Sequence, residues 1–134
     1  MSKISARSLR LAPLTLAAGL ALATSAHADG SSETVTAATH ADLAAGASDL
    51  NGVRTHLHHT LNCLVGPGGQ GFDAKEMNPC AQSGKGAIPD TTDAAKKASL
   101  EAAAEKVRAG LAATDAKAAK ADASAAGAML KSGK

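Results

Sequence analysis

The sequence contains very few aromatic side chains. Among its 134 residues there is one phenylalanine, and there is no tryptophan or tyrosine. This scarcity removes the stacking surfaces on which single-stranded nucleic acids bind, and the large aromatic anchors that tight protein interfaces favour. We therefore expect a protein that does not bind nucleic acid.

Motifs typical of catalysis are also missing from the sequence. We find no Ser/His/Asp arrangement and no paired-carboxylate motif that would indicate an active site. The glycine-rich run at residues 66–71 lacks the Gly-Lys-Ser/Thr ending of a phosphate-binding loop, and we interpret it as a series of turns. The sequence therefore predicts a protein that is not an enzyme.

Long apolar runs are confined to the N-terminus. Three basic residues within the first ten precede an apolar stretch over residues 11–23, and an Ala-His-Ala tripeptide ending at Ala28 matches a signal peptidase site. The stretch is shorter than the roughly 20 residues that a membrane-spanning helix needs. The sequence predicts a signal peptide over residues 1–28 and an exported mature chain, 29–134, that is periplasmic or secreted and has no transmembrane segment.

The mature chain has no excess of positive charge. Removal of the signal peptide leaves 11 basic and 12 acidic side chains, so the net charge is close to zero. The basic character of the precursor therefore belongs to the signal peptide and does not indicate a nucleic-acid surface.

Two segments of the mature chain favour helix, the first through regularly spaced leucines and the second through its alanine content. In the first arm, residues 31–65, leucine recurs every seven residues, which is typical of a helix with one buried face. Gly66 and Pro67 end this arm, because proline cannot continue a helix. The positions of this leucine stripe are Leu43, Leu50, Leu57 and Leu64.

The first arm has weak points in its middle. Gly46 and the pair Asn51-Gly52 each disfavour helix by about 1 kcal/mol relative to alanine. Two interpretations stay open: a single kinked helix, which we favour, or two helices with Ser48 as the cap of the second.

The second arm, residues 90–131, is rich in alanine, the strongest helix former. We expect Asp90 or Thr92 to cap its first turn. A 4–3 spacing predicts one buried face along a continuous helix. The positions of that face are Leu100, Ala104, Val107, Leu111, Thr114, Ala118, Ala121, Ala125 and Ala128.

Together these segments predict an all-α fold, an antiparallel helical hairpin whose two arms are joined by a long Gly/Pro-rich loop over residues 66–89. Large apolar residues are few, so a covalent link, a bound ion or self-association is expected to add stability. The apolar loop residues Phe72, Met77 and Ile88 are expected to fold back over the helices.

The two cysteines, Cys63 and Cys80, lie at the end of the first arm and within the loop. Paired cysteines in an exported chain usually form a disulfide. A redox or haem-binding role is disfavoured because the C-x-x-C spacing is absent. The sequence therefore predicts a Cys63–Cys80 bridge that pins the loop to the first arm.

Three histidines lie in one turn of the first arm, shortly before Cys63. His56 and His59 are three residues apart and therefore adjacent on a helix surface, whereas His58 points elsewhere. Asp49 lies two turns earlier on nearly the same line. Imidazole is a good ligand for copper, zinc and nickel. One interpretation of this pattern is an open, weak metal site at His56 and His59, with Asp49 or a partner chain adding a ligand.

Two other interpretations of the histidines stay open. The first, which we favour at this stage, is a solvated polar face in which the imidazoles have no task. The second is a pH-responsive surface, because neighbouring imidazoles titrate near neutral pH.

The segment His-Leu-His-His-Thr-Leu-Asn-Cys-Leu-Val-Gly-Pro over residues 56–67, followed by the Asn-Pro-Cys that ends at Cys80, resembles small exported proteobacterial proteins of unknown function. The resemblance covers the central third of the chain and implies a helical hairpin with a pinned loop, but no activity. Exported histidine-rich metal-binding proteins are a looser comparison, because they spread histidine along repeated helices whereas this chain concentrates it in one turn.

From these observations we expect a structural or partner-interaction protein of the cell envelope, acting through self-association or an unidentified protein partner. The alternative is a weak copper- or zinc-binding protein that uses the His56/His59 face.

Overall fold

A computed structural model describes residues 29–133, and the predicted signal peptide, residues 1–28, lies outside this range. Within the described range the chain is helical and contains no strand, which confirms the all-α class. The helices are α1 (Ser31–Gly46), α2 (Leu50–Val65), the short α3 (Ala87–Asp90), α4 (Ala94–Ala112) and α5 (Ala116–Ser132).

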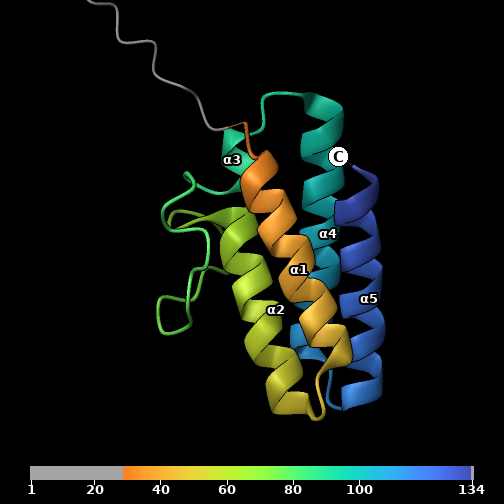
Figure 1. Ribbon diagram of the computed structural model, residues 1–134. Helices are drawn as coiled ribbons and strands as arrows, with labels where there is room; N and C mark the ends of the chain where they lie inside the picture. The colour runs from red at the N-terminus through yellow and green to blue at the C-terminus, as the bar shows by residue number, and fades with distance from the viewer. Residues whose placement is uncertain (1–28, 134) are drawn as a thin grey trace, which may run out of the picture.

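The four long helices form an antiparallel bundle (Figure 1). Helix α1 packs between α2 and α5, and α4 packs against the same two helices from the other side. The chain runs down α1, up α2, through the long loop and α3, down α4 and up α5. Each arm of the predicted hairpin is therefore itself a pair of helices.

The first arm breaks between Gly46 and Leu50. The carboxylate of Asp49 accepts a hydrogen bond from the Gly52 amide at 2.8 Å and so caps the first turn of α2. The favoured single kinked helix was therefore wrong, and the two-helix alternative is correct, with Asp49 rather than Ser48 as the cap.

The second arm is also two helices, which the sequence did not predict. Asp115 caps α5 by accepting a hydrogen bond from the Ala118 amide at 2.9 Å. Because the helix restarts there, the buried face of α5 is displaced from the predicted one, and Ala118, Ala121 and Ala128 are exposed. The buried residues of α5 are Ala119, Ala123, Ala126, Gly127 and Leu130.

Helix α4 begins later than predicted. Asp93 caps it by accepting a hydrogen bond from the Lys96 amide at 2.8 Å, in place of Asp90 or Thr92. Asp90 instead belongs to α3, and its carboxylate accepts a hydrogen bond from the Lys85 amide.

Helix α2 supplies most of the large core side chains. Leu57, Leu61 and Leu64 are buried, together with alanines from α1, α4 and α5. Leu43 belongs to the predicted stripe, but it is 47% exposed. Leu43 does not share a buried face with the later leucines, because α1 ends at Gly46 and the seven-residue spacing does not continue along one helix into α2.

The loop between α2 and α3 is fastened to the bundle. Cys63 and Cys80 form a disulfide, with their Sγ atoms 2.07 Å apart, in agreement with the predicted pairing. Phe72 and Ile88 pack against the core as expected, whereas Met77 is 61% exposed.

One loop glycine is required by a close approach of two backbones. Gly66 has a φ of 66°, and a Cβ built on it would lie 1.6 Å from the Lys85 carbonyl oxygen. Only glycine allows the two ends of the loop to meet at this point.

Of the helices in the described range, none has the length and apolar character needed to cross a bilayer.

Candidate metal-binding site

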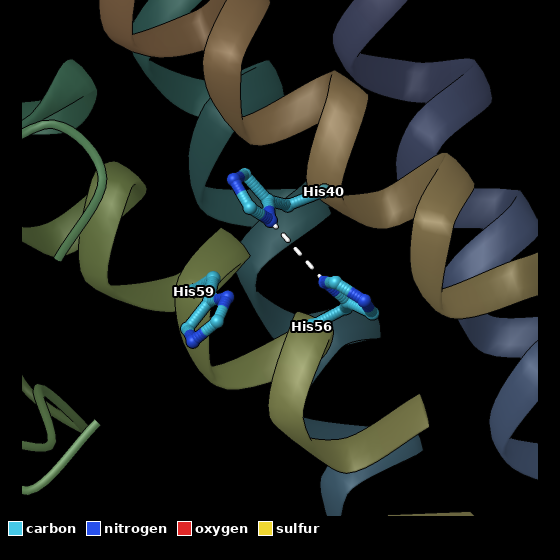
Figure 2. A group of neighbouring side chains, drawn as sticks. All are labelled: His40, His56 and His59. Atoms are coloured by element: carbon cyan, nitrogen blue, oxygen red, sulfur yellow. Dashed lines mark hydrogen bonds between the residues drawn. The ribbon is translucent and has the colours of Figure 1, made fainter. Parts of the chain in front are cut away.

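Three histidines face one another across the contact between α1 and α2. His40 comes from α1, and His56 and His59 come from α2 (Figure 2). His40 and His56 lie eight residues before and eight residues after Ser48, in the connection between the helices. In an antiparallel helix pair, residues equally distant from the turn lie opposite each other, and this symmetry brings the two imidazoles together.

The ligand atoms of the three rings are close. The Nδ1 atoms of His40 and His56 lie 3.4 Å apart, and one nitrogen from each of the three rings falls within 4.8 Å of the others. The ring of His59 stands edge-on to both other rings, at centroid distances of 5.1 Å from His40 and 5.7 Å from His56. The rings therefore surround a common point rather than stack.

A threonine hydroxyl lies between the two helices at this level. Thr60, one turn after His56, donates from Oγ1 to the carbonyl oxygen of His56 at 2.9 Å and lies 3.4 Å from the carbonyl oxygen of Ala37 on α1. Ala37, one turn before His40, and Ala41, the residue after it, are fully buried. Their small side chains allow α1 to lie close to its neighbours, which places His40 within reach of α2.

The surroundings favour neutral imidazoles. Burial lowers the pKa of His40, and the positive charges that His59 and His56 would carry lower it further. Burial also lowers the pKa of His59, with the neighbouring His56 acting in the same direction. Near neutral pH both rings therefore keep an unprotonated nitrogen, which is the form that binds a metal ion.

His59 is the most buried of the three, with 6% of its surface exposed. Its Nε2 atom lies 3.8 Å from the Oε2 atom of Glu76 on the loop. Its Nδ1 atom is buried and has no hydrogen-bond partner among the residues that the structure describes. The two nitrogens of this ring therefore differ: one lies beside a carboxylate and the other is free.

His58 lies outside this cluster, as the sequence predicted. Its Nδ1 atom is 3.9 Å from Oδ2 of Asp73, a residue of the loop between α2 and α3. It shares its helix with His56 and His59 but contributes no ligand atom to the group.

Asp49, the predicted additional ligand, has another role, and Cys63 is not available as a ligand. Asp49 caps α2 and is exposed, and it is not among the residues whose ligand atoms cluster. Cys63 is bonded to Cys80, so its sulfur is not a free thiolate ligand.

His40 is the member of this cluster that sequence reasoning missed. A continuous first arm would place it far from His56 along one helix, so it was not grouped with the others. The available signal was the pair Ser48-Asp49, which matches a helix N-cap. A turn at this pair implies that residues 40 and 56 lie opposite each other.

The comparisons with known proteins give no relative: no family model, curated protein or solved structure matches this chain.

Proposed function

We propose that this protein is an exported, non-enzymatic helical bundle that binds one transition-metal ion, copper or zinc, through His40, His56 and His59. The observation that carries the proposal is the convergence of three imidazoles from two helices within 4.8 Å. The sequence alone indicated two imidazole ligands, His56 and His59. With His40 as a third ligand, most of the coordination positions of a four-coordinate ion would be filled by this chain.

The spacing of the nitrogens supports this proposal. Two nitrogens bound to one tetrahedral ion at the usual zinc–imidazole bond length of about 2.0–2.1 Å lie about 3.3 Å apart. The Nδ1 atoms of His40 and His56 are 3.4 Å apart without an ion between them. Coordination therefore requires little movement of these two side chains.

The donor set also supports a choice of metal. Three neutral imidazoles suit copper, zinc and nickel, and at a fixed nitrogen site Cu²⁺ binds more tightly than Ni²⁺ or Zn²⁺. Three protein ligands leave at least one coordination position for water or a ligand from another molecule. We expect the affinity for Cu²⁺ to exceed the affinity for Zn²⁺.

Calorimetric titration of the mature chain, residues 29–134, with Cu²⁺ and Zn²⁺ tests the proposal. The expected result is a stoichiometry of one ion per chain, with binding strongly weakened in His40→Ala and His56→Ala. His58→Ala is the matched control, because it removes a histidine of the same helix from outside the cluster. The proposal fails if wild type gives no binding heat, or if His40→Ala and His58→Ala bind alike.

A structural or partner-binding role in the cell envelope is the second candidate. A groove of about 910 Å³ lies between the loop and α4, and its apolar lining includes Val65, Pro67 and Ile88. Sedimentation of the mature protein with and without Zn²⁺ separates the two roles. A dimer that forms without metal supports the second candidate, whereas a monomer under both conditions argues against self-association.

A further inference from the structure

The loop that carries Glu76 is attached to α2 directly beside the histidines. Asn62 is buried in α2, and its Nδ2 donates to the carbonyl oxygens of Asp73 at 2.9 Å and Met77 at 3.2 Å. Its Oδ1 accepts a hydrogen bond from the Asp73 amide at 2.9 Å. The Cys63–Cys80 bridge fastens the same loop one residue further along the helix.

These attachments place Glu76 relative to His59. Asn62 and Cys63 follow His59 by three and four residues, so all three lie on one face of α2. Glu76 lies between the loop residues that these two side chains hold. Its carboxylate therefore approaches His59 from a backbone that is anchored on both sides.

Glu76 approaches one nitrogen of the His59 ring, because its Oε2 atom is 3.8 Å from Nε2. Figure 2 shows one nitrogen of this ring turned toward the other two histidines. A negative charge beside Nε2 favours a proton on that nitrogen, and a neutral imidazole then carries its lone pair on Nδ1. Nδ1 is also the buried atom that has no partner within the described part of the chain.

We propose that Glu76 is a positioning residue of the metal site: from its disulfide-anchored loop it keeps His59 in the tautomer that presents the Nδ1 lone pair to the ion. This inference rests on the proposed function. Carboxylates that accept a hydrogen bond from a metal-binding histidine contribute about 10–100-fold to metal affinity.

Two isosteric substitutions in the same loop test the role of Glu76. Glu76→Gln removes the charge beside His59, and Asp73→Asn removes the corresponding charge beside His58, which binds no metal in this scheme. In calorimetric titrations with Zn²⁺ we expect Glu76→Gln to weaken binding about 10-fold or more, and Asp73→Asn to bind like wild type. Equal affinities of the two variants overturn the proposal.

Nitrogen NMR of isotope-labelled, metal-free protein gives a readout that a merely structural role would not change. Above the ordinary histidine pKa of about 6.5, we expect wild type and Asp73→Asn to show His59 with its proton on Nε2. In Glu76→Gln a substantial fraction should carry the proton on Nδ1. An unchanged tautomer overturns the positioning role, whatever the affinities.

The outcomes distinguish this inference from the proposed function. Metal binding that is lost in His40→Ala but unchanged in Glu76→Gln overturns only the role of Glu76. Absence of binding by wild type overturns both the metal function and the positioning role.

Discussion

Glu33, in the first turn of α1, is a charged residue with 0% of its surface exposed. Both of its carboxylate oxygens are buried without a hydrogen-bond partner in residues 29–133. Burial raises the pKa of this carboxyl, and the negative charges of Asp90 and Asp29 act in the same direction. The folded protein therefore binds a proton at Glu33 more tightly than the unfolded chain does.

This difference makes stability depend on pH. A carboxyl whose pKa is raised in the folded state contributes its full stabilisation of the fold below its unfolded pKa of 4.5. This stabilisation is lost as the pH rises through the pKa of the folded state. We expect Glu33→Gln to increase the free energy of unfolding at pH 7 by about 1 kcal/mol, with a smaller gain at pH 4. Urea denaturation at the two pH values measures this, with Glu101→Gln, at an exposed position of α4, as the control. A gain that does not change with pH would contradict the assignment.

Asn62 is a second buried polar residue, but all its groups are paired with the loop backbone. Asn62→Ala leaves the Asp73 amide and loop carbonyls without these partners, so we expect a loss of about 2–3 kcal/mol in the free energy of unfolding. Asn51→Ala, at an exposed position of the same helix, should be nearly neutral. Chemical denaturation of the two variants provides the comparison, and similar stabilities would show that Asn62 does not hold the loop.

At the scale of the elements, aspartate decides where three of the four long helices begin. Asp49, Asp93 and Asp115 each cap the first turn of a helix by accepting a hydrogen bond from the amide three residues later. Two of these caps divide stretches that local composition favours as continuous helix. The resulting helices of 16 to 19 residues are short enough to fold back on one another.

The disulfide-anchored loop is the element that links stability to the metal site. The two cysteines are 17 residues apart, and closing a loop of this length contributes about 3 kcal/mol by the chain-entropy model. We expect the double variant Cys63→Ala/Cys80→Ala to lose stability by about that amount, measured by urea denaturation.

The same double variant should also bind Zn²⁺ more weakly, because Glu76 is no longer held beside His59. A His40→Ala variant with an intact bridge is the control for metal binding at normal stability. Wild-type affinity in the folded double variant would show that the loop does not support the site.

On the scale of the whole molecule, alanine supplies half of the buried apolar residues of the core, and large side chains are few. On α5, a Cβ at Gly127 would lie 3.5 Å from the Cβ of Ala41 on α1, so these two helices approach closely. An ion pair between Lys131 and Asp42, at 2.9 Å, joins the same helices at the surface. Small side chains allow close packing but bury little area each, so a bound ion should contribute a large share of the stability.

Metal binding should therefore raise the melting temperature. An ion at about 100 times its dissociation constant stabilises the folded state by about 2.7 kcal/mol, which corresponds to roughly 10 °C or more for a domain of this size. Thermal denaturation followed by circular dichroism measures the shift. His58→Ala should show the full shift and His40→Ala almost none; equal shifts in both would mean that the ion binds elsewhere.

Particular residues show how far prediction from the sequence reached. The helical class and the Cys63–Cys80 pair were predicted, because alanine content, proline stops and cysteine number act locally or leave a single choice. The buried face of α5 was predicted wrongly, because one cap at Asp115 changes the rotational phase of every later residue. Signal-peptide cleavage stays a prediction, since residues 1–28 lie outside the described range.

The sequence by itself determined that the chain forms helices, and that His56 and His59 share one helix face, because backbone propensity and helical period depend only on neighbours along the chain. Only the tertiary structure decided that the four long helices pack into one bundle, that His40 joins the other two imidazoles, and that Glu76 lies beside His59. These three outcomes require the chain to fold back on itself, and the packing that selects one fold over another acts through space between residues far apart in sequence.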